Sequence, residues 1–377
     1  MTKLLSVVWY KVLPAQFGGQ KGIAEFNDAL SEFFPLTCIC SSNNQPTGHE
    51  KYGVKPLLPV SRGQVIDFRA WKKILQELKQ GNYSHVILEH CYYGLLGMLI
   101  RKRYKTFLVV HSHNIEYLRF QEMKKLWWPL LFQLEKNTHQ SAHLSLFKTE
   151  SDMEFAISRF QLDPARCILT PFGINKTTIP TALQRQTSRS FLNSSFNIPS
   201  NSRLLVFMGT LDYEPNAEAL RKIVNQIIPG IRKLTSIPFK VLVCGRLIEK
   251  KFASLLSLKD EDYIYAGFVP DIEPFFMGAD LLINPVNSGG GIKVKIIEAL
   301  SYGLPVVSTA YGAKGIDETV TGSQLTLVTD NDSSEFCRHI VMSWNKPIGI
   351  PETFREKYEW KKIVREVAER INHLKAV

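Results

Sequence analysis

Residues 284–309 read NPVNSGGGIKVKIIEALSYGLPVVST. An apolar run (residues 280–285) leads into Ser288 and three consecutive glycines, Gly289, Gly290 and Gly291. A helical pattern follows them, and a second apolar run begins after Pro305. Glycines let the backbone approach a ligand closely, and the first turn of a helix offers free N–H groups and the positive end of a dipole. We therefore predict an anion site, typically for phosphate, where this helix starts near residue 292.

The predicted helix carries a polar stripe formed by Lys295, Glu298 and Tyr302. At about 100° per residue these positions share one side, opposite an apolar side. Lys295 could neutralise a phosphate, and Glu298 could accept hydrogen bonds from sugar hydroxyls. The alternative is an ordinary solvated pair three residues apart. The triple glycine before the pair favours the binding interpretation.

Composition points to a two-domain chain with an anionic partner. The chain has 377 residues, 45% of them hydrophobic, and a formal net charge of +11. That charge suggests a nucleotide, a nucleic acid or a membrane surface, although a basic protein without such a partner is the alternative. Six cysteines show no metal-ligand spacing, so we expect no zinc and a reducing compartment. We find no signal peptide or membrane span and predict a cytoplasmic protein.

The first half alternates apolar runs with helical patterns. A run at residues 4–9 precedes the loop that contains Gly18 and Gly19, which could wrap a ligand or be a plain strand-to-helix turn. Further runs occupy residues 36–40, 85–89, 107–111 and 143–147, and one long helix is predicted over 117–137. This alternation predicts a parallel sheet covered on both faces. Ligands bind such sheets beyond the carboxyl ends of the strands.

Polar residues gather at those predicted strand ends. They are Glu89, His90, His111, His113 and Glu116. A histidine there can donate to a sugar hydroxyl or to a reacting group near neutral pH. A lone histidine is more often structural, but this group of polar residues favours function. We assign Glu89, His90, His111 and Glu116 to the acceptor side of a site.

Two segments combine basic and aromatic residues. One runs from Arg101 to Lys105 and the other from Lys124 to Trp128. Such segments suit contact with an anionic membrane, which would make the protein peripheral on the inner face of that membrane. The alternative is that both segments are ordinary solvated faces. We recognise no nucleic-acid motif and expect no nucleic-acid partner.

A second α/β series begins at residue 203, after a stretch rich in Thr, Ser, Asn and Gln at residues 176–202. Gly209 ends its first predicted strand, and Arg246 follows the second. We predict an N-terminal domain over residues 1–185, a C-terminal domain over 186–355 and a last helix over 356–377. This amphipathic helix would pack back across the domains.

The motifs resemble a known family. Gly267-Phe268-Val269, the segment 276–280, the segment 288–298 and Gly303-Leu304-Pro305-Val306-Val307 look like the donor half of retaining, family-4-type glycosyltransferases of the GT-B fold. Gly18-Gly19, residues 113–116 (HNIE) and residues 171–175 (PFGIN) resemble weaker features of the other half.

The resemblance implies two Rossmann-like domains facing each other across a cleft, with no metal or other cofactor. The donor would be a nucleoside-diphosphate sugar and the acceptor a glycan or lipid-linked molecule. Carried over, Glu298 would bind the ribose, and Lys295 with Gly289, Gly290 and Gly291 would hold the diphosphate. His113 would lie near the transferred sugar, and Gly18 and Gly19 would approach the donor. Ser288, Gly209 and Arg246 complete the predicted donor site, with His113, Lys295 and Glu298 as catalytic candidates.

Two departures from the family pattern stand out. Many members carry a glutamate eight residues before the ribose-binding one, where this chain has Gly290. Many also carry an arginine and a lysine after the first strand of the second domain, and residues 209–216 (GTLDYEPN) contain neither. Lys295 would therefore carry more of the diphosphate charge. The alternatives to a retaining glycosyltransferase are a GT-B-fold sugar-nucleotide epimerase and a non-catalytic carbohydrate- or membrane-binding scaffold.

Overall fold

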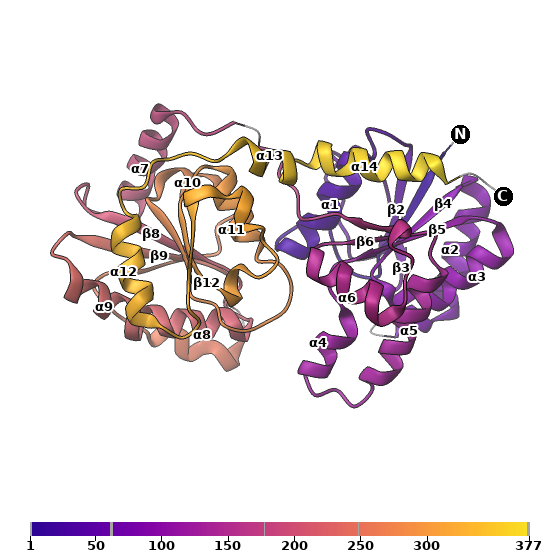
Figure 1. Ribbon diagram of the computed structural model, residues 1–377, viewed down its shortest axis with the longest axis horizontal. Helices are drawn as coiled ribbons and strands as arrows, with labels where there is room; N and C mark the ends of the chain where they lie inside the picture. The colour runs from indigo at the N-terminus through magenta and orange to yellow at the C-terminus, as the bar shows by residue number, and fades with distance from the viewer. Residues whose placement is uncertain (1, 61–62, 177, 248, 375–377) are drawn as a thin grey trace. The chain divides into compact units, whose positions relative to one another are not determined.

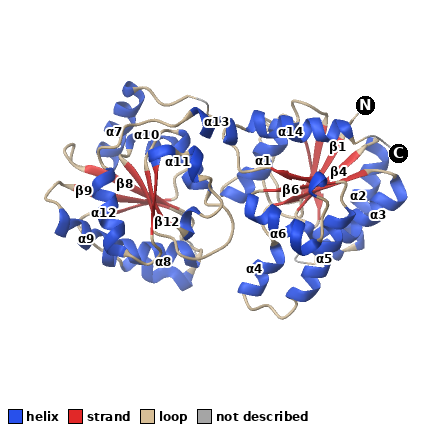
Figure 2. Ribbon diagram, in the orientation of Figure 1, coloured by secondary structure: helices blue, strands red, loops and turns tan. Residues whose placement is uncertain are grey.

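The computed structural model describes residues 2–60, 63–176, 178–247 and 249–374 (Figure 1). The chain forms two compact units. The first contains Met1–Asn175 and Tyr358–Val377, and the second contains Lys176–Lys357. Each unit consists of one parallel sheet with surrounding helices (Figure 2). The α/β prediction with two Rossmann-like domains is confirmed.

The sheet of the first unit has the strand order β3-β2-β1-β4-β5-β6-β7, and every pair is parallel. Its strands are β1 (Leu4–Val7), β2 (Leu36–Ser41), β3 (Gly53–Leu58), β4 (His85–Glu89), β5 (Phe107–Ser112), β6 (Leu144–Phe147) and β7 (Cys167–Leu169). Its helices are α1 (Gly18–Leu30), α2 (Phe68–Gly81), α3 (Gly94–Tyr104), α4 (Glu116–Glu122), α5 (Trp128–Ser141), α6 (Glu150–Phe160) and α14 (Trp360–His373).

The strands of this sheet are buried on both faces, as parallel strands require. Successive residues of β1 belong to separate cores: Leu4 packs in one hydrophobic cluster with Phe26, and Leu5 in another with Ile74. The strand order reverses between β1 and β4, which creates a crevice at their carboxyl ends. The predicted residue Glu89 ends β4 at this point.

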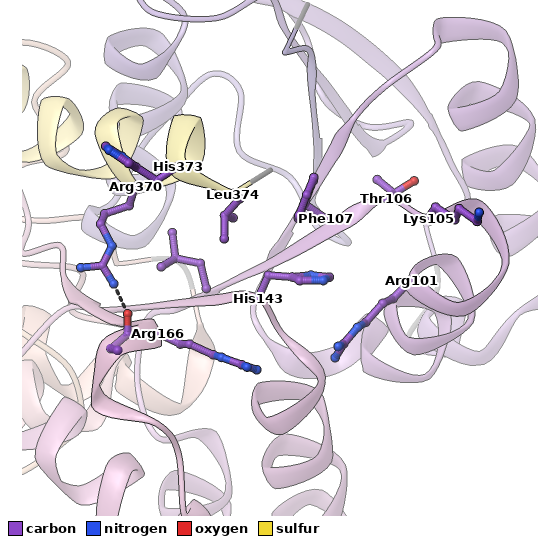
Figure 3. Close-up of a pocket in the computed structure, with 11 residues that line it drawn as sticks. Arg101, Lys105, Thr106, Phe107, His143, Arg166, Arg370, His373 and Leu374 are labelled. Carbon is purple, nitrogen blue, oxygen red and sulfur yellow. Dashed lines mark hydrogen bonds between the residues drawn. The ribbon is translucent and has the colours of Figure 1, made fainter. Parts of the chain in front are cut away.

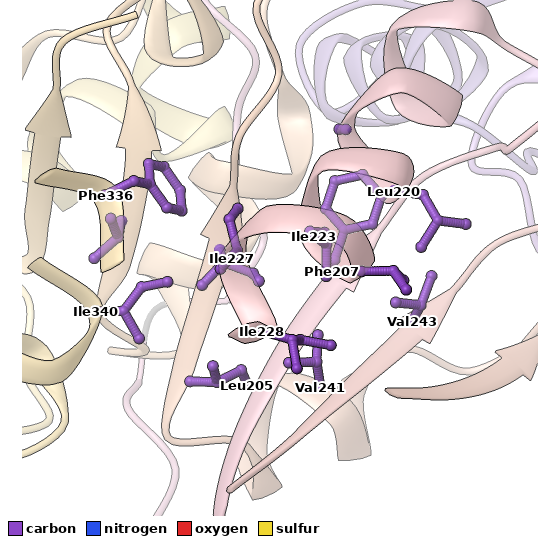
Figure 4. Close-up of a cluster of buried hydrophobic side chains, with 14 of the residues drawn as sticks. Leu205, Phe207, Leu220, Ile223, Ile227, Ile228, Val241, Val243, Phe336 and Ile340 are labelled. Carbon is purple, nitrogen blue, oxygen red and sulfur yellow. The ribbon is translucent and has the colours of Figure 1, made fainter. Parts of the chain in front are cut away.

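The sheet of the second unit has the order β10-β9-β8-β11-β12-β13, and its reversal lies between β8 and β11. Its strands are β8 (Arg203–Met208), β9 (Phe239–Cys244), β10 (Tyr263–Gly267), β11 (Leu281–Asn284), β12 (Val306–Thr309) and β13 (Leu325–Val328). Its helices are α7 (Ala182–Phe196), α8 (Glu214–Lys222), α9 (Ile228–Leu234), α10 (Glu273–Gly278), α11 (Val294–Ser301), α12 (Ser333–Ser343) and α13 (Glu352–Tyr358). Leu205, Val241, Ile228 and Ile340 pack in the core on one face of this sheet (Figure 4).

The structure corrects two helix predictions. The helix expected over residues 117–137 is two helices, α4 and α5, because Lys124 adopts a positive φ of 53° and Pro129 starts a new helix. Residues 176–202, for which no helix was predicted, contain α7, whose Thr181 and Gln184 form a capping box.

The chain leaves the first unit after Asn175 rather than after the expected residue 185, since α7 packs on α10 of the second unit. It returns at Tyr358, and α14 packs on α1 of the first unit. Ile174 connects the outgoing and returning segments of the chain. Its N–H donates to the Tyr358 carbonyl over 2.6 Å, and its own carbonyl accepts from the Trp360 N–H over 3.1 Å. The last three residues of the predicted range 356–377 lie outside the described part of the chain.

Candidate functional site

In the first unit, Glu89 is the centre of a buried cluster at the carboxyl edge of the sheet. Glu89 pairs in register with His111 of β5, so both side chains lie on one face of the sheet. One carboxylate oxygen, Oε2, lies 2.7 Å from His113 Nε2 and 3.0 Å from His111 Nδ1. The rings of His111 and His113 are 4.4 Å apart. The structure therefore brings together three of the predicted residues.

Burial governs the charges in this cluster. Burial lowers the pKa of His111 to about 4, although Glu89 opposes the shift. Burial and the neighbouring histidines also hold the pKa of His113 well below its ordinary value. Burial opposes ionisation of Glu89, but its interactions with His111 and His113 keep its pKa well below the usual range. At neutral pH the cluster therefore holds one carboxylate and two neutral imidazoles.

Among the described residues, Glu89, His111 and His113 are the group whose ligand atoms, all within 4.8 Å of one another, could hold a metal ion. The 2.7 Å contact between Glu89 and His113 is a hydrogen bond. A metal ion would have to displace the proton that the imidazole shares with the carboxylate. The geometry thus fits a hydrogen-bonded network in which Glu89 sets the orientation of His113.

His90 and Glu116 form a second pair beside this cluster. His90 Nδ1 lies 3.0 Å from Glu116 Oε1, and the Tyr92 hydroxyl donates to the other oxygen of Glu116 over 2.8 Å. His90 adopts a positive φ of 73° immediately after β4, and its ring lies 4.5 Å from that of His113. The residues predicted for the acceptor side are therefore contiguous in the first unit.

Two buried charged residues near these clusters were missed by sequence reasoning. Lys148 follows β6, is almost fully buried, and its Nζ has no hydrogen-bond partner among the described residues. Burial lowers its pKa to about 7. Glu135 of α5 accepts from the N–H groups of Glu116 and Tyr117 and so caps α4. Both residues stand in helical or strand patterns without a distinguishing motif, so no sequence signal identified them.

The predicted loop at Gly18 and Gly19 is the first turn of α1 rather than a loop before it. The Gln20 N–H already donates to the Phe17 carbonyl over 2.9 Å. A Cβ added to Gly19 would meet no atom within 4 Å, so space is open next to this turn.

In the second unit, the glycine loop follows β11 and has a backbone that needs glycine at two positions. Gly289 and Gly291 have φ values of 87° and 77°. A Cβ on Gly289 would lie 2.3 Å from the Tyr213 hydroxyl, whereas one on Gly290 would meet nothing within 4 Å. Lys293 donates to the carbonyls of Gly289, Gly290 and Gly291 over 2.9 to 3.2 Å. The Lys293 ammonium thus fixes the loop from its carbonyl side.

The helix after this loop, α11, begins at Val294, two residues later than predicted. Lys295 therefore lies in its first turn. Its ammonium donates to the Met208 carbonyl at the end of β8 over 2.9 Å and lies 4.2 Å from the centre of the Phe207 ring. Burial, together with the charge of Lys293, holds the pKa of Lys295 well below its ordinary value. Lys295 is thus a desolvated amine at the switch point between β8 and β11.

The remaining predicted donor residues come from several elements of the second unit. Glu298 is half-buried one turn further along α11. The Ser288 hydroxyl donates to Glu218 over 3.1 Å. Gly209, with a φ of 154°, ends β8, and a Cβ there would meet the Asn216 amide at 2.7 Å. Arg246 is exposed after β9, with its Nε 4.0 Å from an Asp212 carboxylate oxygen.

Models of two glycosyltransferase families match the two units. The family described as "Glycosyltransferase Family 4" matches residues 18–177, and "Glycosyl transferases group 1" matches residues 202–345. The chain belongs to the group 1 and family 4 glycosyltransferases. This glycosyltransferase is 26% identical over 335 residues to an uncharacterized 44.6 kDa protein in the cps region of Klebsiella pneumoniae, covering 83% of this chain and 78% of that protein. It is also 22% identical over 330 residues to the chitobiosyldiphosphodolichol beta-mannosyltransferase of Debaryomyces hansenii, covering 82% and 68%.

Solved structures share the fold of this glycosyltransferase. The Anabaena protein Alr3699/HepE, crystallised with UDP and glucose, superposes with a TM-score of 0.75 over 99% of this chain and 100% of that one, at 13% identity. WaaG, a glycosyltransferase involved in lipopolysaccharide biosynthesis, superposes with a TM-score of 0.65 over 97% and 95%, at 16% identity. The fold of this glycosyltransferase is therefore GT-B. None of its described helices has the length and apolar character that crossing a membrane requires.

Proposed function

We propose that this glycosyltransferase moves a sugar from a nucleoside-diphosphate sugar to a glycan or lipid-linked acceptor, with retention of the anomeric configuration and without a metal ion. The observation that carries the proposal is the position of Lys295. It is a desolvated amine in the first turn of α11, at the switch point of a parallel sheet and beside a glycine loop, and a bound anion would stabilise its protonated form. An anion placed there would gain both the lysine charge and the helix N-terminus.

The comparisons support the two substrates. Alr3699/HepE was crystallised with UDP and with UDP-glucose, which supports a nucleotide sugar as donor. The relative in the cps region and WaaG support an acceptor in polysaccharide or lipopolysaccharide assembly.

In the proposed reaction, the bond between the anomeric carbon and the leaving phosphate breaks while the acceptor oxygen bonds to that carbon. Negative charge develops on the phosphate, and groups positioned for that charge stabilise the transition state. Lys295 and the glycine-loop amides would perform this task. The departing phosphate would take the acceptor proton on the same face, which gives retention.

The other residues receive roles that follow their positions. Glu298 would accept hydrogen bonds from the ribose, with Ser288, Gly209 and Arg246 around the nucleotide. His113, held by Glu89, would accept a hydrogen bond from a hydroxyl of the transferred sugar, because its neutral ring gives its one N–H at Nε2 to Glu89 and leaves Nδ1 as an acceptor. His90, His111 and Glu116 would shape the acceptor side.

Replacement of Lys295 tests the donor assignment. We expect Lys295→Ala to lower turnover by about 10²- to 10³-fold, the usual effect of losing one donor to a developing anion. Release of nucleoside diphosphate from a nucleotide sugar, with and without acceptor, would be measured. Lys233→Ala, at an exposed lysine of the same unit, is the matched control.

Turnover of Lys295→Ala within threefold of the control would contradict this assignment. Release of an altered nucleotide sugar without acceptor would instead indicate an epimerase.

We further propose that the connection between α4 and α5 contacts an anionic membrane surface. Leu126 is 95% exposed and Leu130 is 76% exposed, and Met123 and Trp127 are exposed beside Lys124 and Lys125. Exposed apolar residues flanked by lysines fit the interface of an anionic bilayer.

Flotation with phosphatidylglycerol vesicles tests this contact. We expect Leu126→Glu to abolish binding, since a carboxylate would enter an apolar and anionic interface. Leu183→Glu, at a leucine of the second unit that is 72% exposed, controls for the charge change. Equal flotation of both variants and the wild type would contradict the proposal.

A further inference from the structure

A second concave site lies at the opposite end of the first sheet from Glu89 and His111. It measures about 550 Å³. Phe107 begins β5, Leu144 begins β6 and Arg166 immediately precedes β7, so the pocket opens at the amino ends of these strands. We call it the amino-edge pocket. It is lined by Arg101, Lys105, Thr106, Phe107, His143, Leu144, Ala165, Arg166, Arg370, His373 and Leu374 (Figure 3).

The lining of this pocket is strongly cationic. Among the described residues, its lining contains three arginines, one lysine and two histidines, and no carboxylate. Outside the lining, Asp163 pairs with Arg166, and its carboxylate oxygen lies 3.7 Å from Arg166 Nε. Arg101 donates to the Ser141 carbonyl and Arg370 to the Ala165 carbonyl. A guanidinium has five N–H donors, so these carbonyl contacts leave further donors available.

Donors of three lining residues, Arg101, Arg166 and His143, lie around the same space. Figure 3 shows the side chains of Arg101 and Arg166 pointing toward the space next to the His143 ring. His143 Nδ1 accepts a hydrogen bond from the Leu108 N–H over 2.9 Å. The proton of the neutral ring is therefore on Nε2, which makes His143 a donor as well. Burial and the charges of Arg101 and Arg166 lower the pKa of His143, which is consistent with this neutral form.

Helix ends explain only part of this charge. Arg101 and Arg370 lie in the last turns of α3 and α14, where cations interact favourably with the helix dipole. His143 lies in the loop before β6, and Arg166 ends a 3₁₀ turn of three residues, which is too short to produce an appreciable dipole. These cationic groups repel one another, and the described lining offers no carboxylate to offset that repulsion. A bound anion would supply the missing negative charge.

We propose that the amino-edge pocket binds a phosphate group, as a monoester or a diphosphate, held by Arg101, His143 and Arg166. Arginine forks match the oxygens of a phosphate, and several charge-assisted hydrogen bonds would act together. The site is separate from the donor site, which belongs to the second unit, and it does not depend on the proposed sugar transfer. It also gives Arg101 and Lys105 a role other than the membrane contact predicted from the sequence.

Side-chain NMR of the histidines tests this proposal in the full chain. Pyrophosphate would be titrated while the ¹⁵N signals of His143 and His373 are followed, so that binding at the glycine loop of the second unit is not counted. We expect saturable shifts and a rise in the pKa of His143, because the anion offsets the two arginines. Arg166→Ala should weaken binding by about tenfold or more, as expected when a charge-assisted hydrogen bond is lost.

A second variant and a control complete the test. In His143→Asn the amide oxygen can still accept from the Leu108 N–H, but the Nε2 donor is removed. This variant should also weaken pyrophosphate binding, followed by His373. Arg103→Ala removes a cation from the same helix outside the pocket lining and should change affinity by less than about twofold, the expected effect of a distant screened charge.

The source of the phosphate is distinguished by a parallel measurement with vesicles. Vesicles of phosphatidylcholine with phosphatidic acid present the same group as a lipid headgroup. Shifts of His143 with pyrophosphate that Arg166→Ala weakens support a free phosphorylated ligand. Shifts that appear only with phosphatidic acid support a headgroup. Absence of both, or equal binding by wild type and Arg166→Ala, overturns the proposal.

Discussion

At the scale of single residues, the backbone requires glycine at Gly289 of the glycine loop but not at Gly290. Gly289 needs its hydrogen side chain, because its φ is 87° and Tyr213 and Pro215 occupy the place of a Cβ. Gly290 has no such constraint, since the space around it is open. The absence of the glutamate that many relatives carry here is therefore not imposed by the backbone.

This contrast gives a prediction with an internal control. We expect Gly289→Ala to lose about 1–3 kcal/mol of unfolding free energy and most donor binding, because a left-handed backbone is strained for alanine. Gly290→Ala should stay within about 0.5 kcal/mol of the wild type, as expected for an exposed position. Urea unfolding and nucleotide affinity would be compared, and equal effects of both substitutions would be inconsistent with the loop geometry. Gly290→Glu should also fold, which allows the effect of the missing carboxylate on turnover to be measured directly.

At the scale of elements, Trp360 attaches the C-terminal helix to the first unit. It is 1% exposed, and its indole N–H donates to Glu25 of α1 over 2.8 Å. Its ring packs against Phe26 and Phe172. A Cβ on Gly173 would lie 2.2 Å from the ring, so the backbone at this position passes directly against it.

We expect Trp360→Ala to destabilise the first unit by about 3–5 kcal/mol, the usual cost of removing a large buried ring. Trp127→Ala, at a tryptophan that is 45% exposed, serves as the control and should cost less than about 1 kcal/mol. Urea unfolding would be followed by far-ultraviolet circular dichroism. Similar losses in the two variants would show that α14 contributes little to the packing.

Several strands that sequence patterns predicted are continuous apolar runs that are buried along almost their whole length, such as β4 and β5. The missed strand, β3, is at the edge of its sheet, alternates between exposed and half-buried residues and contains Pro56. Proline is confined to such edge positions, and the short alternation is a weak signal. The split between α4 and α5 was missed because the helical periodicity continues across the turn at Lys124.

For the candidate site too, the sequence reveals local patterns but not the contacts between distant residues. Strand ends and glycines are local patterns, so Glu89, His111, His113 and Lys295 could be identified from the sequence. Their partners could not, because the contact between Lys295 and the Met208 carbonyl spans 87 positions of the chain. Burial of Lys148 likewise depends on Phe26 and Trp360, which lie far away in the sequence.

At the scale of the whole molecule, buried histidines make stability depend on pH. Burial lowers the pKa of His85 and His111 to about 4 and that of His139 to about 3. In the unfolded chain each would titrate near 6.5. Below that pH the unfolded chain binds protons that the folded chain does not, so stability falls as pH falls. Glu135 acts in the opposite direction, because burial raises its pKa to about 8 and the folded state keeps its proton.

Between pH 6.5 and 5, each of the three histidines should lower the free energy of unfolding by about 2 kcal/mol, because each contributes about 1.4 kcal/mol per pH unit. Glu135 should raise it by about 2 kcal/mol over the same range. We therefore expect a net loss of about 4 kcal/mol from these four groups. Urea unfolding at pH 6.5 and pH 5 measures this loss. His139→Gln should reduce the loss relative to the wild type, and an unchanged difference between the two pH values would show that His139 does not titrate on unfolding.

The return of the chain at Tyr358 also has a consequence for synthesis on the ribosome. The first unit contains residues made before the second unit and, in α14, residues made after it. Its α1 surface around Phe26 must remain uncovered while the whole second unit is translated and folds (Figure 1). A nascent chain that stalls before residue 358 would therefore present one finished unit and one with an open apolar patch, which is the kind of surface that chaperones bind.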